Sequence, residues 1–367
     1  MPTKIQEINY IKKTLSKIPD TWQLNNNSEK QIDSIFSFII KLKEKNPNIS
    51  LSHKLKPHEI PYNNSLLHFL LYYTYHPKYP FIIHKKNNLI IGSFTGRKYN
   101  NLEISFPLIK KASNIIDDLN WLLSIDSFKS ILKKNNIKNI LIRDIDDNFV
   151  KLLKKDEEIF NFKLKSLREL KYATYNVDRT LNLNGVKFAN LRWHINSFKK
   201  RNHKIELVNL SDSVSEVIHL IGKWRKNAIE KRGFSYVNIN SDKLGAKLFG
   251  RKTNYKNYQK KKKIVGPENI ISRILRIDGK IASFNLGFPL GIFQKKDVFA
   301  HTIGIVDTSI PHLAEYAQYN FWKEIKNKGY NYVNDGPTWK NDLRTYKTKF
   351  RPIGKKRYYW ATIVQRL

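Results

Sequence analysis

Segments with the alternating pattern of β-strands and segments with the periodicity of α-helices follow one another along this chain. Residues 79–96 predict a strand, an Asn-rich turn and a second strand, and residues 102–109 predict a third strand. A helix is predicted over 126–135 and another strand over 139–144. Because strands that alternate with helices are typical of layered folds, the first half predicts an α/β structure with helices packed on a sheet.

The second half of the chain repeats this order of elements. Helices are predicted over 185–200 and 211–231, and a later helix is predicted to end at Gly329. Two halves of similar order predict a tandem α/β fold. The strands predicted for the second half cover residues 271–277, 280–288, 298–306, 330–335 and 358–364.

We place the boundary between the two units near residue 165, so that they cover 1–165 and 166–367. A helix-like segment over 151–160 gives way there to a charged connection over 163–171. Net charge also rises across this boundary, from +11 in the first unit to +25 in the second. The functional site is therefore expected in the second unit or between the two.

The net charge of the whole chain is +36, from 67 Lys and Arg against 31 Asp and Glu. Such a field favours polyanionic partners, which include nucleic acid, an anionic membrane surface and a phosphate-rich donor molecule. An AT-rich genome, which enriches Lys together with Asn and Ile, is the alternative source of part of this charge.

Several features bear on the compartment and on metals. The sequence has no cysteine, which excludes disulfides and cysteine-ligated metals, and its ten histidines are scattered. The longest apolar stretch, residues 66–75, is too short to cross a bilayer, and the N-terminus lacks the apolar core of a signal peptide. We therefore expect a cytoplasmic protein with no metal site.

The segment over 251–263 holds seven basic residues and no acidic one. Basic side chains release counterions from phosphates and tyrosines stack on bases, so this segment predicts a contact with nucleic acid. A solvated loop between a helix and a strand is the alternative. The candidate nucleic-acid-binding residues are Arg251, Lys252, Tyr255, Lys256, Tyr258, Lys260, Lys261, Lys262 and Lys263.

The predicted helix over 185–200 has one apolar and one polar face. Arg192 and Asn196 lie four residues apart, so they face the same way and can hold one phosphate or carbonyl together. An ordinary solvated helix face is the alternative. The expected buried stripe consists of Phe188, Leu191, Ile195 and Phe198.

The segment from 183 to 198 also carries a longer pattern of nine residues at fixed spacing. These residues are Leu183, Gly185, Lys187, Phe188, Arg192, His194, Ile195, Asn196 and Phe198. The pattern resembles the signature of the C-terminal catalytic domain of phosphatidylglycerol lysyltransferases and, more broadly, of the tandem-GNAT, FemABX-like aminoacyl and acyl transferases. Later positions with similar family spacing are Tyr316, Asn320, Leu343, Arg344, Lys347 and Pro352.

This resemblance implies two GNAT-like domains, each with a mixed central sheet flanked by helices, of which the second is catalytic. It implies that an amine or hydroxyl attacks the activated carbonyl of a donor held in a splayed sheet. Arg344 and Lys347 would then be fixed cations that hold the donor and stabilise charge on its carbonyl. The implied donor-binding residues are Gly185, Lys187, Arg192, Asn196 and Asn320.

Three further residues are candidates for catalysis. Asp335 follows Asn334 at the end of a predicted strand, where it can bind an amine or act as a base, and a simple Asn-Asp-Gly-Pro turn is the alternative. His301 is a candidate base on the strand over 298–306, where it is expected to share one face with Phe299 and Ile303. Tyr316 is a candidate proton donor to the leaving group. Core packing is the alternative for both His301 and Tyr316.

The family's Asn-x-Glu-x-Asp run is replaced here by Asn334 to Thr338, with its carboxylates displaced. A GNAT enzyme that binds CoA usually has a glycine-rich loop after its fourth strand, and the corresponding residues 307–313 contain no glycine. This favours aminoacyl-tRNA as co-substrate, with no other cofactor. We expect an aminoacyl transferase, and the alternatives are an acyl-CoA-dependent N-acyltransferase and a non-catalytic protein that binds RNA or an anionic membrane surface. The sequence leaves the acceptor and the oligomeric state open.

Overall fold

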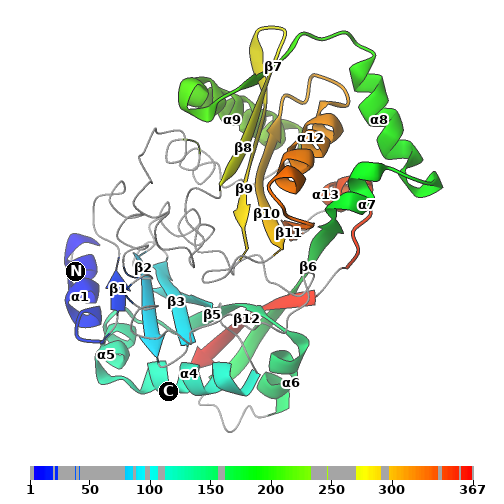
Figure 1. Cartoon of the computed structure of the whole chain (residues 1–367). Coiled ribbons are helices and arrows are strands. Elements are labelled where there is room, and N and C mark those ends of the chain that lie inside the picture. The colour runs from blue at the N-terminus through cyan, green and yellow to red at the C-terminus, as the bar shows by residue number, and fades with distance from the viewer. Residues whose placement is uncertain are drawn as a thin grey trace.

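The computed structural model describes residues 4–19, 21–23, 38, 41, 79–85, 88–95, 100–105, 112–155, 162–232, 246, 270–290, 297–337, 341–354 and 357–365. Across these residues helices and strands alternate, as the sequence predicts (Figure 1). No helix among the described residues is long and apolar enough to cross a membrane.

The first half builds helices whose apolar stripes face a sheet. In the helix over Asp126–Lys134, an aspartate opens the first turn and lysines end the last, which complements the helix dipole, and Phe128 and Ile131 are buried. The elements of this half are α1 (Lys4–Leu15), β1 (Thr21–Gln23), β2 (Tyr79–Lys85), β3 (Asn88–Thr95), β4 (Asn101–Ser105), α4 (Ala112–Ser124), α5 (Asp126–Lys134), β5 (Asn139–Ile145) and α6 (Asp147–Lys155).

The second half begins with the longest strand and repeats the order of the first. Its hairpin turn at Asp278 and Gly279 has positive φ at both residues, as the sequence predicts for an Asp-Gly turn. The elements are β6 (Phe162–Asn176), α7 (Val177–Asn182), the short 3-10 helix η3 (Val186–Phe188), α8 (Ala189–Lys199), β7 (Ile205–Val208), α9 (Leu210–Arg232), β8 (Ile271–Ile277), β9 (Lys280–Pro289), β10 (Val298–Val306), α12 (Leu313–Asn327), β11 (Tyr332–Pro337), α13 (Asn341–Thr348) and β12 (Arg357–Gln365).

The strands of the described residues join one 12-stranded mixed sheet in the order β1-β2-β3-β4-β5-β12-β6-β11-β10-β9-β8-β7. In the first half, β1 to β4 pair with one another in antiparallel order, and β4 pairs in parallel with β5. In the second half, β7 to β10 pair in antiparallel order, and β10 pairs in parallel with β11. The predicted α/β fold class, with a mixed sheet flanked by helices, is therefore confirmed for the described residues.

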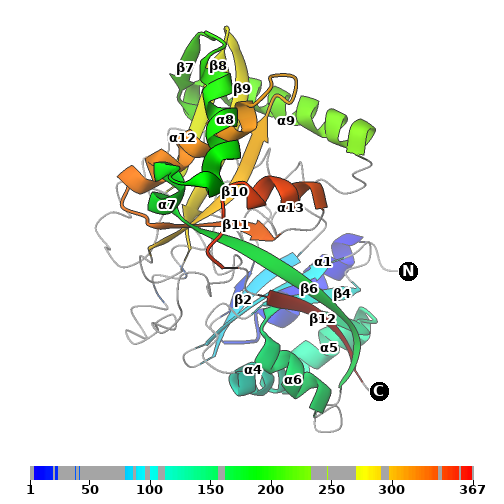
Figure 2. The same ribbon diagram turned by 90° about the vertical axis from the view of Figure 1, so that its right-hand side faces the viewer.

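The strand that follows each parallel pair in the chain joins the other part of the sheet. β6 follows β5 in the chain but pairs with β11, and β12 follows β11 but pairs with β5. The segment over 163–171, expected as a charged connection, is instead the first part of β6 and pairs with β12. Figure 2 shows β6 running between the two halves. The boundary placed near residue 165 falls inside this strand, and the division into two units stays a prediction.

Strand alternation supplies the core on both faces of the sheet. In β2, Phe81 packs with α4 and α5, whereas Ile82 faces a cluster that also holds Phe284 of β9. In β8, Ile274 lies in the same cluster as residues of α9, and Leu275 lies with residues of α8 and α12. α9 and α12 therefore cover opposite faces of the second half. The expected stripe from Phe188 to Phe198 on α8 is buried.

Candidate active site

The candidate site lies where the two parallel strands of the second half part. β10 and β11 pair over three residues each, and Ala300 opposite Asn334 is the last pair. Beyond it, β10 continues along β9 and β11 continues along β6. His301 and Asp335 are the next residues, so they stand at the point of separation. This is the splayed sheet that the family resemblance implies.

A β-bulge in β10 turns His301 toward α12. The pairing with β9 shifts register between His301 and Ile303, and Ile303 packs in the same cluster as Ala300, on the α9 side. The ring of His301 instead lies 4.9 Å from that of Phe321 on α12. The expectation that Phe299, His301 and Ile303 share one face is therefore wrong for Ile303, because the extra residue reverses the alternation.

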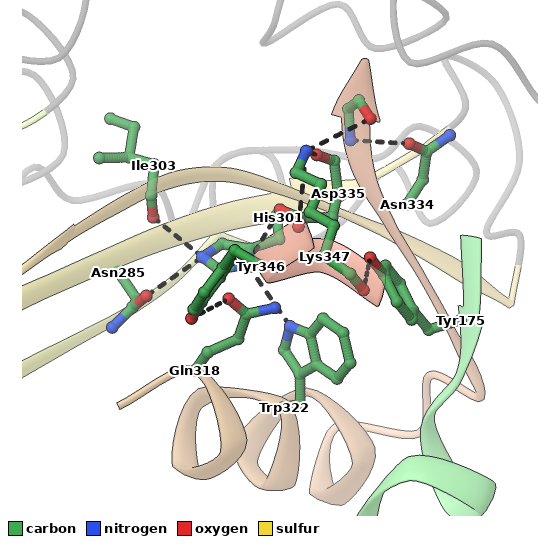
Figure 3. Close-up of polar contacts among 11 residues, drawn as sticks. Tyr175, Asn285, His301, Ile303, Gln318, Trp322, Asn334, Asp335, Tyr346 and Lys347 are labelled. Atoms are coloured by element: carbon green, nitrogen blue, oxygen red, sulfur yellow. Dashed lines mark hydrogen bonds and ion pairs between the residues drawn. The ribbon is translucent and has the colours of Figure 1, made fainter. Parts of the chain in front are cut away.

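Asp335 lies between a histidine and a lysine (Figure 3). Its Oδ1 is 3.4 Å from Nδ1 of His301, and its Oδ2 is 3.5 Å from Nζ of Lys347. The side chains of His301 and Lys347 are 3% and 8% exposed, and that of Asp335 is 12% exposed. Of the five residues predicted as catalytic, the structure thus brings Asp335, His301 and Lys347 together.

The hydrogen bonds of His301 define its tautomer. Its Nε2 lies 3.1 Å from Oδ1 of Asn285 and 3.1 Å from the carbonyl oxygen of Ile303, so Nε2 carries the hydrogen. Nε1 of Trp322 donates to Nδ1 at 3.4 Å, and the lone pair of Nδ1 also faces Asp335. Burial lowers the pKa of His301 more than the Asp335 carboxylate raises it, which favours a neutral ring.

Lys347 reaches the site from the last turn of α13. Its ammonium donates to the main-chain oxygens of Asp335 and, at 3.4 Å, of Gly336, where β11 no longer runs beside β10. Tyr175 on β6 donates its hydroxyl to the carbonyl oxygen of Lys347 at 3.0 Å and holds the end of α13. Burial lowers the pKa of Lys347, and the Asp335 carboxylate opposes this shift. The ammonium therefore supports β11 and balances the charge of Asp335.

Two residues that the sequence reasoning missed line the α12 side of the site. Tyr346 donates its hydroxyl to Oε1 of Gln318 at 2.9 Å, and burial raises the pKa of Tyr346 well above its ordinary value. Nε2 of Gln318 is buried and has no hydrogen-bond partner among the described residues. Gln318 and Trp322 lie four residues apart on the buried face of α12, and a glutamine among the apolar residues of this face was the available signal.

The other predicted catalytic residues lie apart from Asp335. Arg344 is exposed on α13, one turn before Lys347. Tyr316 is half-buried and packs its ring against Phe198 of α8, with centroids 4.4 Å apart. Asn320 donates from Nδ2 to the carbonyl oxygen of Tyr316 at 2.8 Å. The structure thus places Tyr316 at the contact between α12 and α8, and the roles of Tyr316 and Asn320 stay predictions.

The predicted donor-binding residues of the 183–196 segment lie around one loop. Nη1 of Arg192 donates to the carbonyl oxygens of Leu183 and, at 2.8 Å, of Gly185, so its guanidinium is turned toward the loop. Lys187 and Asn196 are exposed. Asn196 is exposed on α8, whereas Arg192 is bound to the loop, so the structure does not bring these two side chains together on one ligand.

A second polar cluster, which sequence reasoning missed, lies between α8, α12 and the turn after α13. Nδ1 of His194 is 2.7 Å from Nδ1 of His312, and Nζ of Lys349 lies 3.3 Å from the other nitrogen of His194. Lys349 also pairs with the buried carboxylate of Glu315 at 2.7 Å. Burial lowers the pKa of His194. In the sequence, only the match of His194 to the family pattern indicated this cluster, because His312 and Lys349 are distant from His194 along the chain.

Two further predictions concern ligands. The candidate nucleic-acid segment, residues 251–263, lies outside the described residues, so its role stays a prediction. Among the residues that the structure describes, no group of three or more His, Asp or Glu side chains is placed to hold a metal ion.

Comparisons with known proteins find similarity to solved structures and none to a protein-family model or a curated protein. A conserved protein of unknown function from Bacteroides thetaiotaomicron is 16% identical, with a TM-score of 0.63 over 94% of this chain and 99% of that one. This likeness shows a shared fold along nearly the whole chain.

Two other solved structures carry names from the group that the sequence pattern resembles. The C-terminal domain of a protein assigned as a lysylphosphatidylglycerol synthetase, from Agrobacterium fabrum, is 12% identical, with a TM-score of 0.48 over 77% of this chain and 84% of that one. A tandem GNAT protein from the clavulanic acid biosynthesis pathway is 6% identical, with a TM-score of 0.48 over 93% of this chain and 97% of that one.

Proposed function

We propose that this protein transfers an aminoacyl group from an aminoacyl-tRNA to an amine or hydroxyl acceptor. The observation that carries the proposal is the position of Asp335. It is a partly exposed carboxylate between a buried imidazole and a buried ammonium, directly after the point where two parallel strands part. Groups of this kind, held in a desolvated setting, are typical of sites that move protons.

The reaction needs a base for the acceptor and an acid for the leaving group. Asp335 takes the proton from the N–H or O–H of the acceptor while the acceptor atom attacks the carbonyl carbon of the ester. The new bond from the acceptor to that carbon forms, and the bond from the carbon to the ribose oxygen breaks. The proton then passes from Asp335 to the departing ribose oxygen, so protons and charge balance over the whole step.

His301 and Lys347 set the state of Asp335 during this step. The ammonium of Lys347, 3.5 Å away, balances the charge of the carboxylate that accepts the proton. The neutral ring of His301 offers Nδ1, 3.4 Å from the carboxylate, as a second place for the proton while the leaving group departs. Nε2 of His301 is engaged with Asn285 and Ile303, so the ring keeps its orientation.

The choice of tRNA as the donor's carrier is supported by charge. The chain's net charge of +36 favours a polyanion, and the exposed Arg344 lies one turn from Lys347, where a donor phosphate or carbonyl can meet it. An acyl-CoA donor fits the same attack and the same base, and it is the second candidate because the parted strands favour neither carrier.

The test is to identify the product. The protein is incubated with tRNA charged with labelled amino acids and with a cell extract, and the labelled product is identified by mass spectrometry. We expect loss of ester-linked label from tRNA and its appearance in one acceptor, in wild type but not in Asp335→Asn. Transfer from acyl-CoA alone would establish the second candidate. RNA binding without any transfer from either donor would contradict a transferase.

A further inference from the structure

An open hollow of about 490 Å³ lies between the end of α7 and the start of α8. Two of its lining residues, Arg179 and Lys187, are basic, two more carry side-chain amides, and none of the seven is acidic. Figure 1 shows this part of the chain at the outer edge of the second half, beside α12. The lining residues are Arg179, Asn182, Asn184, Gly185, Val186, Lys187 and Phe188.

The carbonyl oxygens of the loop that forms this hollow are held by two guanidinium groups. Arg192 donates to the carbonyl oxygens of Leu183 and Gly185, and Nε of Arg351 donates to that of Lys187 at 2.7 Å. The loop needs left-handed backbone at Leu183, with φ of 52°, and at Gly185, with φ of 82°. These three carbonyl oxygens are thus engaged, while the side chains of Arg179 and Lys187 offer hydrogen-bond donors to the hollow.

Carboxylates near the hollow are also engaged elsewhere. Asp178 precedes Arg179 in the chain, and its Oδ2 pairs with Nζ of Lys326 on α12 at 2.6 Å. Arg179 and Lys187 are exposed, and no ion pair joins either to a carboxylate within the described part of the chain. Two cations and two amides around an open hollow, without a competing acid, form a setting that suits an anion with several oxygens.

We infer that this hollow binds a phosphate group of the nucleotide part of the donor. The inference rests on the proposed function and deepens it by assigning a place for the donor's phosphate ester. Arg351, which holds the loop, follows the buried Lys347 by four residues, and Thr180 of α7 donates to the carbonyl oxygen of Phe350. Residues 347–351, at the end of α13 and in the turn after it, thus contact both Asp335 and the elements that form the hollow.

The test measures the affinity of a labelled single-stranded RNA by fluorescence anisotropy. Replacing Arg179 and Lys187 together by Gln is expected to raise the dissociation constant by about tenfold for each lost charged contact. The slope of affinity against salt concentration, on logarithmic scales, is expected to become shallower by about 0.7, since the hollow holds one phosphate and each phosphate neutralised on a single strand contributes about 0.7. Thermal unfolding of the double variant is expected to match wild type, because both side chains are exposed.

The matched control is Lys151→Gln with Lys154→Gln, which removes the same charge from exposed positions on α6 in the other half. Equal losses of affinity in the two double variants would overturn the inference, because net charge alone would then explain RNA binding. CoA and inorganic phosphate are added as competitors. Competition that depends on Arg179 and Lys187 supports a phosphate site. The affinity of CoA in this competition, compared with the affinity of the RNA, identifies the carrier.

Vesicles of phosphatidylglycerol in phosphatidylcholine form a separate arm of the experiment. If the Arg179 and Lys187 double variant loses vesicle binding but still binds RNA and CoA like wild type, the assignment of the hollow to the donor is overturned. The proposed function is judged independently, from transfer measured at saturating charged tRNA. A double variant that binds RNA normally while Asp335→Asn abolishes transfer would refute the inference and leave the proposed function standing.

Discussion

Asp144 and Asp335 occupy equivalent positions in the two halves of the sheet. Among the described residues, each directly follows the last residue that pairs with the parallel neighbour, Arg143 on β5 and Asn334 on β11. Their surroundings differ. Asp144 accepts hydrogen bonds from the hydroxyl of Tyr172 at 2.6 Å and is 3% exposed, whereas Asp335 faces the ionisable groups of His301 and Lys347. Asp335 is thus flanked by an imidazole and an ammonium, whereas Asp144 is held by neutral hydrogen-bond donors, Tyr172 and Trp360.

The buried Asp144 is expected to make stability depend on pH. Burial raises its pKa, so the folded state holds the proton more tightly than the unfolded chain, and this contribution to stability is lost as pH rises from about 4 through the folded pKa. Asp144→Asn, which keeps an acceptor for Tyr172, is therefore expected to equal or exceed wild type in free energy of unfolding at pH 7. The gap is expected to shrink toward pH 4, measured by urea denaturation. A flat difference across this range would contradict the argument, and Asp117→Asn on an exposed position is the control.

Lys347→Met is expected to destabilise the protein by about 3 kcal/mol, because the change leaves a buried carboxylate and two carbonyl oxygens without their cation. Arg344→Gln, three residues earlier on the exposed side of α13, is expected to leave the unfolding free energy unchanged. Both are measured by urea denaturation. Similar values for the two variants would show that Lys347 does not form the buried ion pair.

His301 is expected to make the protein less stable in mild acid. Because its pKa is lowered on folding, the unfolded chain binds the proton more readily, so stability is lost as pH falls from about 6.5 through the folded pKa. Each unit by which the pKa is lowered corresponds to about 1.4 kcal/mol. The loss between pH 7.5 and 5.5 is expected to be smaller in His301→Gln than in wild type, and His194→Gln serves to separate the share of His194. An equal loss in His301→Gln and wild type would contradict a buried neutral ring.

Gly304 tests the placement of the imidazole without removing it. A Cβ at this position would lie 3.1 Å from Nε2 and 3.2 Å from Cε1 of His301, so the ring must shift by a few tenths of an ångström. Gly304→Ala is expected to lower the rate of transfer by about tenfold, since small misplacements of reacting groups are costly. Gly222→Ala on α9 has no atom within 4 Å of the added Cβ and is expected to leave the rate unchanged. If Gly304→Ala also transfers at the wild-type rate, the position of His301 does not matter.

The order of elements could be predicted from the sequence, and the long-range pairing could not. Hydrophobic periodicity located β2, β3, β5, α5 and β8 to β10, because each carries its own local pattern. The exchange of β6 and β12 between the halves depends on contacts between residues far apart in the chain. β6 has charged residues over 163–171 because this part of the strand is mostly exposed, so its composition imitates a linker.

The site was predictable in part for the same reason. Asp335, His301 and Lys347 were singled out by residue type and by position at strand ends or in a family pattern. Their meeting depends on a bulge after His301 and on the end of pairing at Asn334, and neither feature has a local sequence signal. Gln318 and Tyr346 were missed because their contact joins two helices that are adjacent only in the folded chain.

The most direct test of the account compares Asp335→Asn with Asp144→Asn in a single-turnover assay. Each variant, in excess over tRNA that carries a labelled amino acid, is mixed with the acceptor identified for wild type, and the fall in ester-linked label is followed. Asp335→Asn is expected to transfer at least about a hundredfold more slowly than wild type, within the range for loss of a general base, and Asp144→Asn at the wild-type rate. Wild-type transfer by Asp335→Asn, in a variant shown to be folded, would contradict the central claim.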